Sequence, residues 1–146
     1  MLSRTAEHAL RAVLFLARSE PGERVPVARI ATALGAPQNY MGKTLQALVG
    51  AGLLESTRGP GGGFRLVRSP EVLTVADLAG AVEGRRGSGM CLMGGRRCSS
   101  ATPCGAHERW QAVQRAAAAP LRRTTIADLM GNGTVRARTG SIRPGR

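Results

Sequence analysis

The chain has 146 residues, which is enough for one domain or for one domain with an added arm. Its formal net charge is +12, and because Lys43 is its only lysine, the other 20 of its 21 basic residues are arginine. This excess favours a polyanionic partner, either nucleic acid or an anionic membrane. A run of about 18 apolar residues and a signal-peptide pattern are both missing, which argues against membrane insertion or export. We therefore expect a cytoplasmic protein.

Three early segments carry mostly apolar side chains at the i, i+3, i+4 and i+7 spacing of an amphipathic helix. These side chains are Leu10, Val13, Leu14 and Ala17, then Val27, Ile30, Ala31 and Leu34, then Met41, Thr44, Leu45 and Leu48. Pro26 suits the first turn of the second helix, and Gly50 and Gly52 close the third. A short turn over residues 35–37 separates the second helix from the third, which is the arrangement of a helix-turn-helix.

Two short apolar runs follow, residues 53–56 and 64–67, on either side of a Gly/Pro-rich turn at 58–63. This pattern predicts a β-hairpin. A hairpin directly after a helix-turn-helix is a wing, and Arg58 and Arg65 place positive charge at its base. The glycines of the turn let the backbone approach a partner closely.

The second half of the chain contains two similar helix starts. Thr74 is followed three residues later by Asp77, which predicts a capped helix, and residues 125–129 repeat nearly the same pattern. Residues 84–103 are rich in Gly, Arg and Ser and predict a loop. A helical stretch then begins at Cys104, with Pro120 ending it or beginning the next helix. The basic residues beyond Met130 predict a disordered arm.

The three cysteines of the chain lie within one short stretch, as Cys91, Cys98 and Cys104, and His107 follows. Their odd number argues against a closed disulfide framework. Thiolates gathered this closely, with an imidazole nearby, suit an iron–sulfur cluster or zinc. On a helix, residues i and i+3 share a face, so Cys104 and His107 could address one metal. Glu7, on the first helix, is a further candidate ligand.

The third helix and the wing carry side chains and backbone suited to phosphates or base edges. The candidate DNA-contacting residues are Gln38, Asn39, Tyr40, Lys43, Thr44, Arg58, Gly61, Gly62 and Arg65. Walker, Ser-His-Asp and paired-carboxylate patterns are missing, so we do not expect an enzyme.

Two motifs together resemble the Rrf-two family of transcription regulators, with its IscR-like and NsrR-like branches. They are Arg58-Gly59-Pro60-Gly61-Gly62-Gly63-Phe64-Arg65-Leu66 in the wing and the three cysteines before a helix that carries Trp110. The resemblance covers about residues 1–130. It implies a dimeric winged-helix protein with a long dimerisation helix near its C-terminus and an iron–sulfur cluster, [2Fe-2S] or [4Fe-4S], held by the cysteines.

The resemblance also implies two alternatives for the fourth ligand. His107 falls on the fourth ligand of the IscR-like branch, whereas Glu7 falls near the N-terminal acidic ligand that an NsrR-like protein takes from its partner subunit. Six residues, rather than the five of the IscR-like pattern, separate Cys91 from Cys98. The branch, the cluster type and the fourth ligand therefore stay open.

We accordingly expect a mainly α fold: a winged helix-turn-helix over residues 1–70, a cluster loop and dimerisation helices over 71–130, and a basic tail over 131–146. The expected function is a homodimeric repressor that binds a roughly palindromic promoter site on double-stranded DNA. An iron–sulfur cluster that senses nitric oxide, redox state or cluster supply would control its affinity. The alternative is a zinc-stabilised nucleic-acid-binding module with no sensing role.

Overall fold

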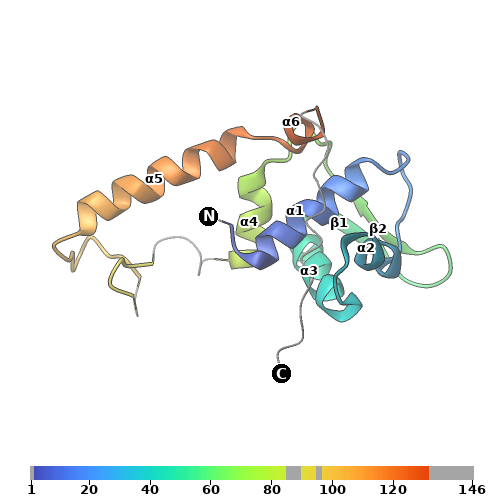
Figure 1. The fold of residues 1–146 in the computed structure, drawn as a ribbon, viewed down its shortest axis with the longest axis horizontal. Helices are drawn as coiled ribbons and strands as arrows, with labels where there is room; N and C mark the ends of the chain where they lie inside the picture. The colour runs from blue at the N-terminus through green and yellow to red at the C-terminus, as the bar shows by residue number, and fades with distance from the viewer. Residues whose placement is uncertain (1, 85–89, 95–96, 132–146) are drawn as a thin grey trace, which may run out of the picture.

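The described part of the chain, residues 2–84, 90–94 and 97–131 of a computed structural model, contains six helices and one two-stranded hairpin (Figure 1). The basic tail predicted from residue 131 onward lies, apart from Gly131, outside the described residues. The elements are α1 (Arg4–Ala17), α2 (Val27–Leu34), α3 (Gln38–Gly50), β1 (Leu54–Thr57), β2 (Gly63–Leu66), α4 (Val75–Glu83), α5 (His107–Arg123) and α6 (Ile126–Gly131).

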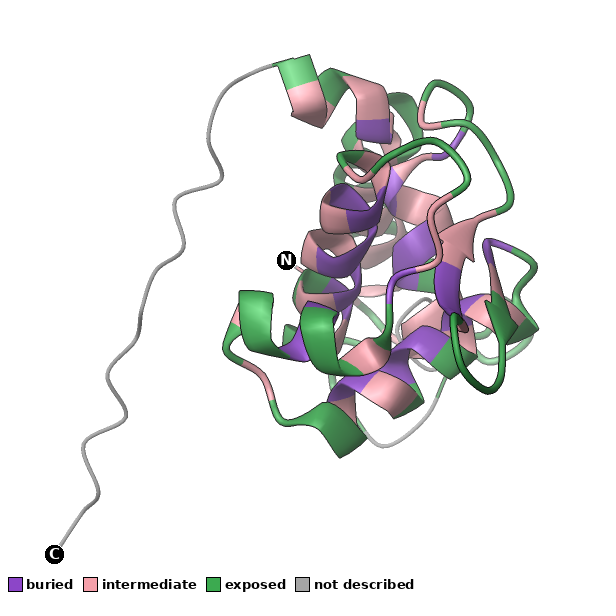
Figure 2. Cartoon of the chain, turned by 90° about the vertical axis from the view of Figure 1, so that its right-hand side faces the viewer, coloured by how far each residue is buried: buried purple, intermediate pink, exposed green. Residues whose placement is uncertain are grey.

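Helix α1 lies at the centre of the hydrophobic core. Its residues Ala9, Ala12 and Val13 are fully buried, and α2, α3, α4, α6 and β2 all contact it. Small alanine side chains let neighbouring helices approach closely. The same core continues through Leu73 of the second half to Ile126, so segments 1–70 and 71–130 share one core (Figure 2).

The helix-turn-helix forms as the sequence predicts. Gly35 ends α2 in the left-handed conformation, with φ of 62°, a conformation that glycine adopts at no steric cost. Pro37 precedes the first turn of α3. The inward face of α3, which includes Met41, Leu45 and Leu48, is fully buried, and this burial fixes which face of α3 remains outside.

The wing is an antiparallel hairpin in which Leu54 lies opposite Leu66 and Thr57 opposite Gly63. Val25, just before α2, extends the hairpin because its N–H and C=O both bond to Phe64, each at 2.9 Å. A side chain at position 63 would meet the Val25 carbonyl at 2.5 Å. The glycine is therefore required for the wing to pack against its own chain.

The two predicted capped helix starts are present and lie side by side. Thr74 and Asp77 form a reciprocal capping box at α4, and Thr125 and Asp128 bond in the same way at α6. Hydrogen bonds to Thr125 lower the pKa of the Asp128 carboxyl. Thr74 and Thr125 also pair as an antiparallel bridge, which ties α6 to the start of α4.

Helix α5 extends away from the core (Figure 1), and none of its side chains is fully buried. Two predictions about it were wrong in detail. The helix begins at His107 rather than at Cys104, and Pro120 lies inside it rather than at a boundary. Pro120 is tolerated three residues before the helix end, where its carbonyl accepts hydrogen bonds from both the N–H and the hydroxyl of Thr124.

None of the helices in the described ranges combines the length and the apolar character that a membrane crossing needs.

The capping box of α4 generates a test of stability. Replacing Thr74 by alanine removes the hydroxyl that accepts from the Asp77 N–H, so we expect the free energy of unfolding to fall by about 1 kcal/mol. Urea unfolding followed by circular dichroism measures the change. Thr32→Ala is the control: it removes the same atoms at an exposed position inside α2, where they cap no helix, and should not destabilise the protein. Equal stability of Thr74→Ala and the unsubstituted protein would contradict this role of the cap.

Candidate metal centre and nucleic-acid interface

The four candidate ligands at residues 91, 98, 104 and 107 all come from the segment between α4 and the first residue of α5. Cys91 is buried, with 7% of its surface exposed, while Cys98, Cys104 and His107 are half-buried. Leu92 and Met93 beside Cys91 are 54% and 79% exposed. The described residues 90–94 and 97–106, called the ligand loop below, therefore lie mostly at the surface and include one buried thiol.

These four side chains meet as two close pairs. The Sγ atoms of Cys91 and Cys104 are 3.9 Å apart, and Cys98 Sγ lies 3.2 Å from His107 Nδ1. The other ring nitrogen of His107 lies 3.5 Å from the Ser100 hydroxyl. Within residues 2–84, 90–94 and 97–131, no three His, Cys, Asp or Glu side chains gather into one metal site.

The contact of His107 differs from the one that helical spacing suggests. The His107 N–H donates to the Cys104 carbonyl at 2.9 Å, so Cys104 belongs to the turn that leads into α5 and not to the helix. Two residues three apart share a helix face only when both lie within the helix. His107 consequently contacts Cys98 of the loop instead of continuing a Cys104 face.

Glu7 lies on α1, where its half-exposed carboxylate forms an ion pair with Arg11 at 2.5 Å. The spacing of i and i+4 is favourable for such a pair on a helix. In this subunit the carboxylate is thus engaged within α1, whereas His107 contacts a cysteine directly.

The predicted DNA-contacting residues of α3 divide into two groups. Gln38, Asn39 and Lys43 are exposed. Thr44 is only 3% exposed and its hydroxyl donates to the Tyr40 carbonyl. The Tyr40 hydroxyl donates to Thr5 of α1 at 3.1 Å, and its ring packs edge-on against His8. Tyr40 thus joins α3 to α1, Thr44 is bonded within α3, and Gln38, Asn39 and Lys43 form the outer polar face of α3.

The wing presents its two arginines differently. Arg58 is exposed in the turn at the tip of the wing, rather than at its base as expected, whereas Arg65 forms an ion pair with Glu55 on the opposite strand. The same Glu55 oxygen accepts from Arg24 at 3.2 Å. Sequence reasoning missed Glu55, although the hairpin register, which places Glu55 opposite Arg65, is the signal that could have found it.

The two predicted wing glycines also differ. Gly61 has φ of 72° and open space around it, so the tip can approach a partner closely. At Gly62 a side chain would meet the Thr57 carbonyl at 2.3 Å, so this residue closes the turn of the wing itself.

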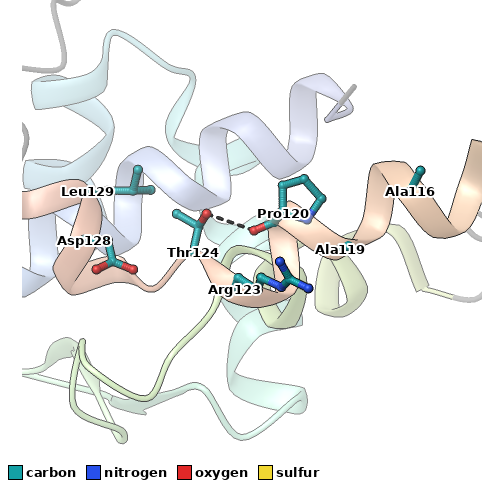
Figure 3. Close-up of a pocket in the computed structure, with 7 residues that line it drawn as sticks. All are labelled: Ala116, Ala119, Pro120, Arg123, Thr124, Asp128 and Leu129. Atoms are coloured by element: carbon teal, nitrogen blue, oxygen red, sulfur yellow. Dashed lines mark hydrogen bonds between the residues drawn. The ribbon is translucent and has the colours of Figure 1, made fainter.

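A solvent-open pocket of about 610 Å³ lies at the junction of α5 and α6, at the other end of α5 from His107. Figure 3 shows its lining, with Ala116 and Ala119 on α5, Leu129 on α6, and the hydrogen bond from Thr124 to Pro120. Its lining includes no cysteine or histidine, so it is separate from the candidate ligands.

Comparison with known proteins agrees with the winged-helix fold. Residues 2–132 match the Rrf2 family, described as iron-dependent transcriptional regulators. The chain belongs to the Rrf2 family. It is 28% identical over 134 residues to the HTH-type transcriptional regulator IscR of Vibrio vulnificus (strain YJ016), covering 92% of this chain and 79% of that protein.

Two solved structures share the fold of this Rrf2 protein. CymR of B. subtilis, described as a global cysteine regulator, superposes with a TM-score of 0.72 at 22% identity, covering 92% of this chain and 98% of CymR. IscR of T. potens superposes with a TM-score of 0.69 at 24% identity, covering 90% and 86% of the two chains. The chain therefore has the winged-helix fold of the Rrf2 family, and as a member of that family it is a transcription regulator rather than an enzyme.

The exposure of Arg58 and the ion pair of Arg65 generate a test of the wing. Arg58→Ala should weaken binding to specific and non-specific duplexes alike and reduce the salt dependence by about one phosphate contact. Arg65→Ala should have a smaller effect, since its charge is shared with Glu55. Fluorescence anisotropy at several salt concentrations measures both effects.

Arg18→Ala, which removes an exposed arginine at the end of α1, is the control for overall charge. Amine-reactive labelling of Lys43 adds an independent check, because it is the only lysine side chain and bound duplex should protect it. Unchanged affinity in Arg58→Ala, together with unprotected Lys43, would rule out this face as the DNA contact.

Proposed function

We propose that this Rrf2 protein is a homodimeric repressor whose affinity for a roughly palindromic promoter site is controlled by an iron–sulfur cluster. Cys91, Cys98 and Cys104 would hold the cluster, with His107 as the fourth ligand. The bound cluster would supply a centre that responds to nitric oxide, to redox state or to cluster supply. The residues of this chain would hold the centre and transmit its state to the DNA-binding face.

The division of the four candidate ligands into two close pairs carries the proposal. Each iron of a [2Fe-2S] cluster takes two protein ligands, and the Cys91–Cys104 and Cys98–His107 pairs match that requirement. Structural zinc instead needs all four ligands around one ion. In a [4Fe-4S] cluster each iron takes one protein ligand, so ligands need not approach in pairs. The arrangement of the ligands in two pairs therefore favours a [2Fe-2S] cluster over the zinc-stabilised alternative.

Proximity favours His107 over Glu7 as the fourth ligand. His107 already contacts Cys98 in the same subunit, whereas Glu7 would have to leave its ion pair with Arg11 and come from the partner subunit. A neutral imidazole also raises the reduction potential relative to an all-thiolate site.

The exposed side of α5 supports a homodimer. Ala112, Val113, Ala116 and Pro120 are all exposed, and positions 112, 116 and 120 recur at helical spacing on one side. A long helix whose apolar side is exposed in its own subunit is expected to bury that side against another. Two copies related by a two-fold axis would place two α3 helices over a roughly palindromic site.

Purification without oxygen tests the cofactor. The unsubstituted protein should be coloured and contain iron and sulfide, because the thiolates and the imidazole supply a complete ligand set. Cys98→Ala should lose the visible absorption, while the neighbouring Ser99→Ala should retain it. His107→Ala should change the spectrum and Glu7→Ala should not.

Each alternative gives a distinct result in that experiment. A colourless protein with bound zinc would replace the proposal by the zinc-stabilised module. A spectrum sensitive to Glu7→Ala and insensitive to His107→Ala would transfer the fourth ligand to the partner subunit.

Cluster control of DNA binding requires that the cluster bind one DNA-binding conformation better than another. We expect affinity for one promoter site to differ at least about tenfold, or about 1.4 kcal/mol, between protein with the cluster and protein without it. Anisotropy at fixed salt before and after anaerobic removal of the cluster measures the ratio. Equal affinities would show that the cluster has a structural role and does not control DNA binding.

A further inference from the structure

Two side chains of α5 converge on a single carbonyl of the ligand loop. The indole N–H of Trp110 donates to the Met90 carbonyl at 2.7 Å, and the side-chain amide of Gln114 donates to the same oxygen at 3.2 Å. Trp110 and Gln114 lie four residues apart and so occupy one helix face. A carbonyl oxygen has two lone pairs and can accept both bonds.

This carbonyl belongs to the peptide unit that directly precedes Cys91. Met90 is also bridged to Arg97 across the loop, and the Cys91 carbonyl accepts from Gly94 at 2.9 Å. Cys91 is buried, whereas Leu92 and Met93 beside it remain largely exposed. The two bonds from α5 therefore join the backbone next to the buried thiol directly to the helix.

Helix α5 consequently holds both members of the Cys91–Cys104 pair. Cys104 is joined to α5 through the short turn that ends at His107, and Cys91 is held through Trp110 and Gln114. At about 100° per residue, Ala112 and Ala116 lie roughly opposite these two side chains on the helix. One side of α5 thus binds the ligand loop, and the other side is exposed.

We propose that Trp110 and Gln114 are positioning residues for the ligand Cys91. Through them, binding of the cofactor is coupled to the position of α5. The inference rests on the proposed cluster function for the role of Cys91. The two side chains touch the loop backbone rather than the cofactor. They fix the distance between the thiols of Cys91 and Cys104 before the cofactor binds and resist its release afterwards.

Release of iron to a chelator tests the positioning role. Trp110→Phe retains an aromatic ring without the N–H, and Gln114→Leu retains the size without the amide. Each should release iron about fivefold faster than the unsubstituted protein, as expected for one lost hydrogen bond. Gln111→Leu, one residue beyond the indole on the same helix, is the matched control and should release iron at the unsubstituted rate.

A substitution that keeps a donor separates positioning from a merely structural role. Gln114→Lys, which supplies a donor of similar reach, should restore slow release, whereas Gln114→Leu should not. Because Trp110 is the only tryptophan, its fluorescence also reports directly on this contact. The emission should change in Gln114→Leu and stay unchanged in Gln111→Leu. These variants should fold normally, since α5 has no buried side chain.

The outcomes distinguish this inference from the function on which it rests. A colourless unsubstituted protein overturns the cluster proposal and, with it, the ligand role of Cys91. A coloured protein in which Trp110→Phe and Gln114→Leu release iron at the control rate retains the cluster function and overturns the positioning role alone.

Discussion

The burial of α1 is the constraint on which the rest of the structure depends. Ala9, Ala12 and Val13 have no exposed surface, and every element of the described chain except β1 and α5 is among the principal neighbours of this helix. Interiors packed this closely do not deform continuously. The outer face of α3, the wing and the capped starts of α4 and α6 are therefore held as one body.

Helix α5 and the ligand loop depend much less on that core. Helix α5 has no fully buried side chain, and Trp110 and Gln114 of this helix bond to the ligand loop at Met90. At the wing, Glu55 offsets part of the charge of Arg24 and Arg65. The positive charge of the wing is thus uneven, because the exposed Arg58 at the tip has no ion pair within the described residues.

Local patterns in the sequence were sufficient to predict the helices and the hairpin, because caps such as Thr74 and periodic apolar residues act over a few positions. The site was less predictable. The pairing of His107 with Cys98 depends on where α5 begins, and that start has no side-chain cap to mark it. Finding the Glu55–Arg65 pair requires the hairpin register as well as the two strands, and that register is set by the turn geometry together with the hydrophobic pattern.

The length of α5 places the ligand loop far from α6 at the other end of the helix. Its 17 residues span about 25 Å at the usual helical rise. A rotation of about 5° at the Thr124 end therefore displaces the loop end by about 2 Å. Conversely, a change of a few tenths of an ångström between two thiols alters the direction of the whole rod by only about a degree. Small changes at the ligand loop therefore shift the direction of α5 little, whereas small rotations at the α6 end move the loop much further.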